Sequence, residues 1–193
     1  VLKALLDLGI VPDIICGTSI GALVGGCYLA GHLDTLEAWA RGLNKPRLLS
    51  YIDLFAGGSG LMGGKRLTKE MEKYFAGLKI EDLDRKFCAV CAELATGHEI
   101  WLQDGDLITA IRASYALPGI FSPVMVGDRW LVDGALVNPV PVSTARAFGA
   151  EIVIAANLSS DVFAHSTTVY SHGPAAEAAA IPELAVEPAP PKR

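Results

Sequence analysis

The feature that most constrains the fold is a glycine-rich turn between an apolar strand and an apolar helix. Residues 13–16 form a short apolar run, residues 17–21 follow the pattern G-x-S-x-G, and residues 20–30 are rich in small and apolar side chains. A strand that turns sharply into a helix places Ser19 at the helix N-terminus, where free backbone N–H groups and the helix dipole favour negative charge. This arrangement is typical of a nucleophile elbow. The sequence therefore predicts an α/β fold with Ser19 at the start of a helix.

The same turn is also compatible in principle with a structural role or with phosphate binding. In the first, Ser19 is only the N-cap of the following helix, and Gly17 and Gly21 only shape the turn. In the second, the turn binds a phosphate, but residues 17–21 lack the Lys and Ser/Thr of a P-loop and the G-x-G-x-x-G pattern of a dinucleotide site. The phosphate interpretation is excluded, and the N-cap interpretation stays open beside the elbow.

Composition limits the partners and the location of the chain. Its 193 residues, 51% of them hydrophobic, are enough for one domain with a sizeable core. A net charge of −5 does not supply the broad basic face that binding to nucleic acid requires. Because no stretch of about 18 apolar residues is present, we expect no membrane-spanning helix and predict a cytoplasmic protein, or one peripheral to the membrane.

The four cysteines are expected to be buried core residues rather than ligands or disulfide partners. Cys88 and Cys91 have C-x-x-C spacing, but they lie in an apolar run that is typical of a strand. Residues three apart on a strand point to opposite faces, so the two thiols do not converge on a metal. The other two cysteines, Cys16 and Cys27, flank the turn in similarly apolar surroundings.

The remaining pattern predicts an α/β sandwich around a mostly parallel sheet with antiparallel hairpins attached. Helices are expected at residues 1–8, 34–43 with Asp34 as N-cap, 65–75, 106–113 and 141–148, and strands at 13–16, 87–95, 99–102, 124–126, 130–132 and 151–158. The run at 151–158 is rich in β-branched residues and predicts a buried parallel strand. A glycine-rich connection at residues 57–64 is a candidate lid or surface loop. Residues 161–193 are rich in Ala and Pro and predict a disordered tail.

A serine nucleophile needs a base, because a free hydroxyl is a weak nucleophile at neutral pH. Asp133 follows an apolar strand and precedes Gly134, so its carboxylate stands at a strand end, although an Asp before Gly is also a common turn residue. The histidines offer the other candidates, and they are His32, His98, His165 and His172. We expect the first two of these on the surface, whereas the last two lie where the regular pattern ends.

Three blocks of the chain resemble the patatin-like phospholipases, and most of all the bacterial proteins related to neuropathy target esterase. The blocks are residues 1–25 around the elbow, residues 112–123 with Ser114 and Pro118, and residues 132–142. The resemblance covers about residues 1–160 and implies the family's three-layer α/β sandwich with a mostly parallel central sheet. Residues 161–193 fall outside it.

The resemblance implies a catalytic dyad without histidine, in which Ser19 is the nucleophile and Asp133 acts directly as the base. Gly134 and Ala135 then form a D-G-A variant of the family's D-G-G motif, and Gly17, Thr18 and Gly21 belong to the elbow. The implied reaction is hydrolysis of a lipid carboxylic ester through an acyl-enzyme, with no metal or cofactor and with transient contact to a membrane surface. The family's glycine-rich oxyanion loop is expected before residue 1, outside this chain.

Two alternatives to this function stay open at the level of sequence. One is an α/β-hydrolase esterase with a triad of Ser19, Asp133 and His165, which follow one another in the required chain order. The other is a catalytically impaired fragment or interaction module that keeps the elbow but lacks a working oxyanion site.

Overall fold

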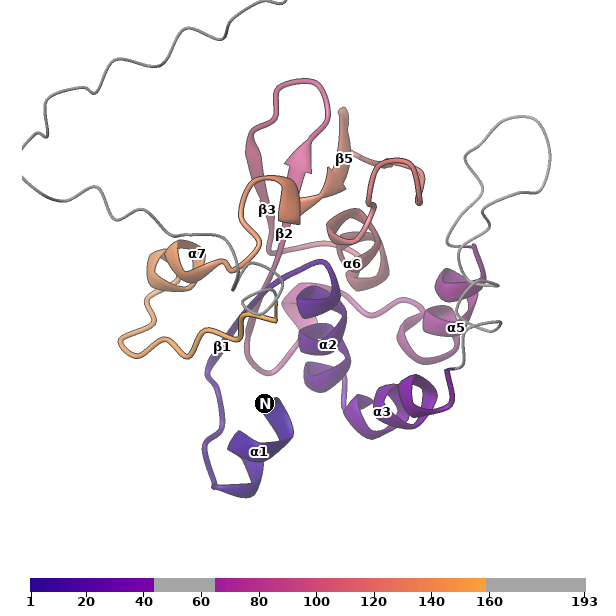
Figure 1. Cartoon of the computed structure of the whole chain (residues 1–193). Coiled ribbons are helices and arrows are strands. Elements are labelled where there is room, and N and C mark those ends of the chain that lie inside the picture. Colours follow the sequence, from indigo (N-terminus) through magenta and orange to yellow (C-terminus); the bar gives the residue numbers. More distant parts are fainter. Residues whose placement is uncertain (44–64, 159–193) are drawn as a thin grey trace, which may run out of the picture. The chain divides into compact units, whose positions relative to one another are not determined.

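A computed structural model describes residues 1–43 and 65–158 of the chain (Figure 1). The helices are α1 (Leu2–Asp7), α2 (Ile20–Leu29), α3 (Leu33–Arg41), α5 (Lys65–Phe75), α6 (Leu107–Ser114) and α7 (Val142–Ala147), with short 3₁₀ segments η1 (Ile80–Asp82) and η2 (Gly134–Leu136). The strands are β1 (Ile14–Thr18), β2 (Lys86–Glu93), β3 (Glu99–Leu102), β4 (Val124–Val126) and β5 (Arg129–Asp133). These bounds confirm the predicted strand, turn and helix at the elbow and both predicted hairpins. No helix in the described ranges is long and apolar enough to cross a membrane.

Strand β2 is the centre of the sheet, and its pairing decides where the other strands end. Ala89 and Val90 pair with β3 and with β1 at once, whereas Cys91 and Ala92 pair with β3 and with β5. Because β3 occupies one edge of β2 from Ala89 to Ala92, β1 and β5 share the other edge there and lie end to end along it. The β1 pairing is parallel and the β5 pairing is antiparallel, so the C-terminal ends of β1 and β5 meet at the middle of β2.

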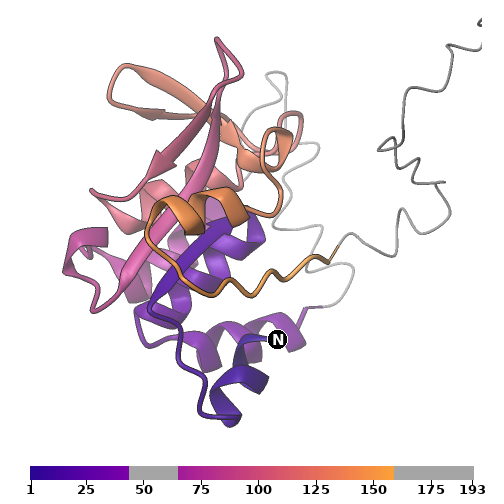
Figure 2. The same cartoon turned by 90° about the vertical axis from the view of Figure 1, so that its left-hand side faces the viewer.

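The sheet lies between two helical layers, as the sequence predicts for an α/β sandwich (Figure 2). Phe87 and Ala89 of β2 face a core cluster that includes buried residues of α2 and α6, such as Leu23 and Ile111. Helix α7 covers the other face beside β1. The sheet is mixed rather than mostly parallel, since β1–β2 is the parallel pairing and β2–β3, β2–β5 and β4–β5 are antiparallel.

The prediction of a buried parallel strand at residues 151–158 is wrong. This segment is not assigned to any strand, and the side chains of Ile152 and Ile154 are 85% and 55% exposed. Its start is held by Arg146, whose guanidinium donates to the carbonyls of Ala150 and Glu151. An apolar, β-branched composition favours a strand only where a neighbour supplies the ladder, and none of the described strands pairs with this segment.

Other details of the prediction also need correction or lie outside the described residues. The N-cap of α3 is His32 rather than Asp34, which sits in the first turn, where a carboxylate still complements the helix dipole. The candidate lid at 57–64 and the tail at 161–193 fall outside the described residues. The predicted surface position of His32 is only half correct, because its ring packs 5.1 Å from that of Tyr74 and 5.6 Å from that of Phe75.

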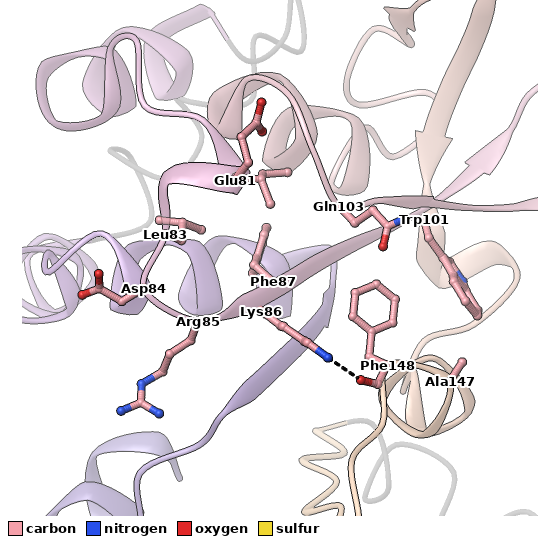
Figure 3. Close-up of a pocket in the computed structure, with 11 residues that line it drawn as sticks. Glu81, Leu83, Asp84, Arg85, Lys86, Phe87, Trp101, Gln103, Ala147 and Phe148 are labelled. Atoms are coloured by element: carbon pink, nitrogen blue, oxygen red, sulfur yellow. Dashed lines mark hydrogen bonds between the residues drawn. The ribbon is translucent and has the colours of Figure 1, made fainter.

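An open cavity of about 630 Å³ lies where β2 begins (Figure 3). Lys86 and Phe87 at the start of β2 line it together with Trp101 of β3 and Phe148 after α7. The Lys86 ammonium donates to the Phe148 carbonyl oxygen at 3.1 Å and the Trp101 and Phe148 rings meet edge to face. Lys86 pairs with Ile14 at the start of the β1–β2 ladder, whereas Ser19 follows Thr18 at the end of that ladder. This cavity therefore lies at the opposite end of the ladder from Ser19.

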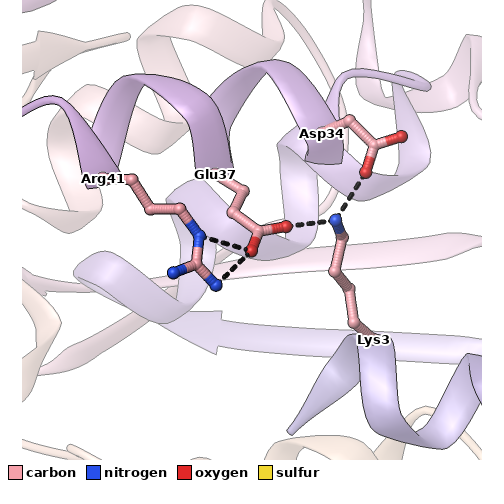
Figure 4. A network of polar contacts seen from close by, with 4 residues as sticks. All are labelled: Lys3, Asp34, Glu37 and Arg41. Atoms are coloured by element: carbon pink, nitrogen blue, oxygen red, sulfur yellow. Dashed lines mark hydrogen bonds and ion pairs between the residues drawn. The ribbon is translucent and has the colours of Figure 1, made fainter.

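A network of charged side chains connects α1 to α3 (Figure 4). Lys3 of α1 forms ion pairs with Asp34, at 2.6 Å, and with Glu37, and Glu37 also accepts from Arg41 one turn along α3. The hydrogen bond from Lys3, followed by that from Arg41, lowers the pKa of Glu37 below its ordinary value of 4.5. Since α1 has no buried residue, we expect these exposed contacts to contribute to its attachment to the rest of the domain.

We predict that the attachment of α1 weakens on acidification and that Glu37 is responsible. A carboxylate whose folded-state pKa is lowered stabilises the fold fully above its unfolded pKa, and this contribution is lost as pH falls below about 4.5 through the folded value. Glu37→Gln should speed hydrogen exchange of the α1 amides at neutral pH. In the native chain, about 1 M salt should also speed this exchange, because it screens the ion pairs. The control is Glu72→Gln on the exposed face of α5, and equal effects of the two substitutions would contradict the assignment.

Candidate active site

Ser19 sits in a strained backbone conformation at the point where β1 turns into α2. Its φ and ψ are 55° and −120°, and it is the one non-glycine residue with a positive φ among the described residues. Such conformations cost about 1–3 kcal/mol and persist where the surrounding structure enforces them. Ser19 is the N-cap of α2, yet its side chain makes no capping hydrogen bond. The simple N-cap interpretation therefore does not describe what the hydroxyl does.

The turn requires glycine at position 17, where the chain packs closely, but not at position 21. A Cβ on Gly17 would lie 2.5 Å from the backbone nitrogen of Ala22 and 2.5 Å from the carbonyl oxygen of Gly21. The strand end therefore packs directly against the first turn of α2, which only a glycine permits. A Cβ on Gly21 would meet nothing within 4 Å.

The Ser19 hydroxyl donates a hydrogen bond to the carboxylate of Asp133. The distance from Oγ to Oδ2 is 2.7 Å, across 114 residues of sequence. Asp133 is the last residue of β5 and is only 3% exposed. Its other oxygen, Oδ1, accepts from the backbone N–H of Ala135 at 2.8 Å. Each carboxylate oxygen thus has one partner, so the turn and the contact with Ser19 use different atoms of the same side chain.

Gly134 and Ala135, which follow Asp133, differ in how closely they approach the sheet. A Cβ on Gly134 would lie 2.2 Å from the carbonyl oxygen of Val90 in β2, so no larger residue fits there without a backbone shift. Ala135 is exposed. The second position of the D-G-A motif therefore accommodates a side chain, which explains why alanine stands where the resembled motif has glycine.

Two further hydroxyl groups hold the elbow in place. Ser114, at the end of α6, accepts from the Ser19 backbone N–H at 2.9 Å and donates to the Val90 carbonyl at 2.6 Å. Thr18 donates through Oγ1 to the carbonyl of Asn138 at 2.8 Å, which links the end of β1 to the loop after Asp133. Sequence reasoning gave Ser114 no role of its own. The available signal was one polar residue in the otherwise apolar run of residues 113–117, which precedes Pro118.

The described histidines do not reach the pair of Ser19 and Asp133. His32 packs against aromatic side chains of α5, and His98 is exposed in the turn between β2 and β3. His165 and His172 lie outside the described residues. The residues that the structure brings together are therefore a serine and a carboxylate in direct contact.

The four cysteines are free; Cys27, Cys88 and Cys91 are buried, as predicted, whereas Cys16 is only half-buried. Burial, with the nearby charge of Asp133, raises the pKa of Cys91 to about 12, and burial raises that of Cys27 to about 12. A hydrogen bond between Cys16 and Cys88 raises the pKa of Cys88 and lowers that of Cys16. Cys91 lies opposite Asp133 and stays a thiol at neutral pH. The described residues contain no group of three His, Cys, Asp or Glu side chains arranged to hold a metal ion.

A serine at a strained strand-to-helix turn, in contact with a buried carboxylate, defines an α/β protein of the nucleophile-elbow class. The patatin-like phospholipase family model matches residues 1–146, and the chain belongs to this family. The α/β three-layer sandwich of the family agrees with the layers seen here.

Relatives are found in bacteria and in animals. An uncharacterized NTE family protein of Mycobacterium tuberculosis is 33% identical over 159 residues, which is 82% of this chain and 44% of that protein. Patatin-like phospholipase domain-containing protein 7 of Mus musculus is 29% identical over 167 residues, covering 83% of this chain and 12% of the mouse protein. A patatin-like phospholipase domain-containing protein of Caenorhabditis elegans is 31% identical over 180 residues, or 90% of this chain and 13% of the nematode protein. The chain thus spans less than half the length of these relatives.

The two glycines of the elbow should respond in opposite ways to alanine. Gly17→Ala forces a methyl group into backbone at 2.5 Å and should destabilise the domain by about 1–3 kcal/mol or more. Gly21→Ala adds a methyl group in open space within a helix and should stabilise it by up to about 1 kcal/mol. Denaturant unfolding of both variants beside the native chain measures the difference. Similar losses in the two variants would contradict the close approach at Gly17.

Proposed function

We propose that this chain is a serine lipid acyl hydrolase, which cleaves carboxylic esters of phospholipids or lysophospholipids through a Ser19–Asp133 dyad and an acyl-enzyme. The observation that carries the proposal is the direct 2.7 Å hydrogen bond from Ser19 Oγ to Asp133 Oδ2 at a strained elbow. The hydrolase domain is assigned to residues 1–160, with residues 161–193 as a separate tail. Membership of the patatin-like phospholipase family supports the reaction class.

In the first half of the reaction, Ser19 Oγ attacks the ester carbonyl carbon while its proton passes to Asp133 Oδ2. The carbonyl oxygen becomes an oxyanion beside the first turn of α2, where the N–H of Ile20 follows the nucleophile and the helix dipole favours negative charge. Collapse of the tetrahedral intermediate breaks the ester C–O bond. The departing alcohol takes the proton from Asp133, and the acyl group stays on Ser19.

In the second half, a water molecule attacks the acyl-enzyme with Asp133 as the base. The proton of the water passes to the carboxylate, the bond from Ser19 Oγ to the acyl carbon breaks, and Oγ regains the proton as the fatty acid leaves. The hydrogen bond from the Ala135 N–H to Oδ1 keeps Oδ2 directed toward Ser19 in both halves. No histidine is needed to carry the proton.

The direct contact also argues for a dyad over the triad that includes His165. In a triad, the imidazole stands between the hydroxyl and the carboxylate and bonds to both. A separation of 2.7 Å between Ser19 Oγ and Asp133 Oδ2 leaves no room for a ring between them.

Exposed apolar side chains next to the dyad support a lipid as the substrate. Ile20, which follows Ser19, is 58% exposed, and Leu136, three residues after Asp133, is 59% exposed. Leu117 is 37% exposed and follows Ala116, whose carbonyl accepts from the Asp133 N–H at 3.0 Å. Apolar surface on three segments beside the reacting atoms suits an acyl chain and transient contact with a membrane surface.

The test is the rate at which a fluorophosphonate probe labels the chain, followed by hydrolysis of a lysophospholipid. Ser19→Ala should abolish both, because the attacking oxygen is removed. Asp133→Asn should lower both by about 10²- to 10⁴-fold, because the amide cannot accept the proton. Asp128→Asn is the control, since it makes the same charge change in the exposed turn between β4 and β5.

Labelling of Ser19→Ala at the native rate would sink the proposal, and an unaffected Asp133→Asn would remove the aspartate from it. His165→Ala decides between the two enzyme classes. The dyad requires that this variant keep the native rate, whereas a triad requires a loss comparable to that of Asp133→Asn. Failure of the native chain to react with either reagent would favour the interaction module instead.

A further inference from the structure

The strained conformation of Ser19 needs a partner that holds its backbone, and Ser114 meets this requirement. The last parallel pair between β1 and β2 is Thr18 with Val90, so Ser19 is the first residue to leave the ladder. Its N–H donates to Ser114 Oγ at 2.9 Å, and Ser114 Oγ donates onward to the Val90 carbonyl at 2.6 Å. The Ser114 hydroxyl therefore bridges the backbone of Ser19 and that of Val90 in β2.

The direction of the two hydrogen bonds is fixed by chemistry. A backbone N–H only donates and a carbonyl oxygen only accepts, whereas a hydroxyl does both. Ser114 is 0% exposed, so no solvent water competes for either bond. A hydroxyl between the two backbone groups spans a longer gap than a direct bond, which lets the chain turn away from β2 and still stay attached to it.

The same short segment also holds the backbone of the proposed base. Two residues after Ser114, the carbonyl of Ala116 accepts from the Asp133 N–H at 3.0 Å. The Val90 carbonyl that accepts from Ser114 also packs against Gly134, the residue after Asp133. The end of α6 thus fills the junction between β1 and β5 and contacts the backbone on both sides of it.

We propose that Ser114 is a positioning residue for the nucleophile, which keeps Ser19 in its strained conformation with Oγ directed at Asp133 Oδ2. This inference rests on the function proposed above and goes beyond it, because Ser114 touches neither the substrate nor the reacting atoms. Without the hydroxyl, the Ser19 N–H loses its acceptor and the strain at φ 55° is no longer opposed. Ser19 then relaxes toward an ordinary φ, and its Oγ leaves the line of attack.

The test separates the rate of the chemical step from binding of the probe. In the full chain, Ser114→Ala should lower the maximal rate of fluorophosphonate labelling by about 10- to 100-fold, as expected for a misplaced nucleophile, without changing the probe concentration that gives half the maximal rate. The control is Thr109→Val on the same helix, which removes a hydroxyl that donates at 2.6 Å to Asp106, the N-cap at the other end of α6. It should keep the native labelling rate even if its melting temperature falls.

A second readout does not depend on activity. Hydrogen exchange of the Ser19 amide, followed by NMR, should be faster in Ser114→Ala than in the native chain and unchanged in Thr109→Val. If Ser114→Ala does not fold, Ser114→Cys takes its place, since the thiol fills the site of the hydroxyl but is a weak donor and acceptor. Native labelling kinetics in a folded Ser114 variant, or an unchanged Ser19 amide, overturns the inference.

The two proposals fail in distinguishable ways. If Ser19→Ala labels as fast as the native chain, the hydrolase function is wrong, and the amide exchange still decides whether Ser114 holds the Ser19 backbone. If Ser19→Ala is inert and Ser114→Ala reacts like the native chain, the function stands and the positioning role falls.

Discussion

The site depends on the pairing of two strands along one edge of β2. β1 runs parallel to β2 and ends with Thr18 opposite Val90, and β5 runs antiparallel and ends with Asp133 opposite Cys91. Ser19 and Asp133 are therefore brought together by adjacent positions on a third strand, although 114 residues separate them in sequence. Their hydrogen bond is a consequence of this register, and a shift by one residue in either strand would turn one of the side chains to the other face.

The close packing at this junction explains which small residues the site requires. Gly17 lets β1 pack against the first turn of α2, and Gly134 lets the chain after β5 pass over the Val90 carbonyl. Gly21 and Ala135 belong to the same motifs, but a Cβ on Gly21 would meet nothing within 4 Å and Ala135 is exposed. Each of the two motifs thus contains one position that requires glycine because two backbone segments pack together there. At the same junction, Ser114 bridges the Ser19 N–H and the Val90 carbonyl.

Local patterns in the sequence were sufficient to predict most of the elements but not the pairings between them. The elbow could be predicted because the change from a strand to a helix period falls at a G-x-S-x-G pattern, and both hairpins because turn residues separate apolar runs. The end-to-end arrangement of β1 and β5 has no local signal, since it depends on which residues of β2 each strand contacts. The same limit explains the error at residues 151–158, where composition favours a strand but no described strand pairs with it. The catalytic pairing of Ser19 with Asp133 was expected only from the family resemblance, because spacing alone favoured a turn role for Asp133.

Because Ser19 and Asp133 are each aligned to β2, the geometry between them does not depend on the length of chain that connects them. The tips of both hairpins lie outside these pairings with β2, so a change in their length does not move either strand end along β2. Insertions at these tips should therefore leave the separation of Ser19 Oγ and Asp133 Oδ2 unchanged. This independence makes one arrangement of serine and aspartate compatible with surrounding surfaces of different shape.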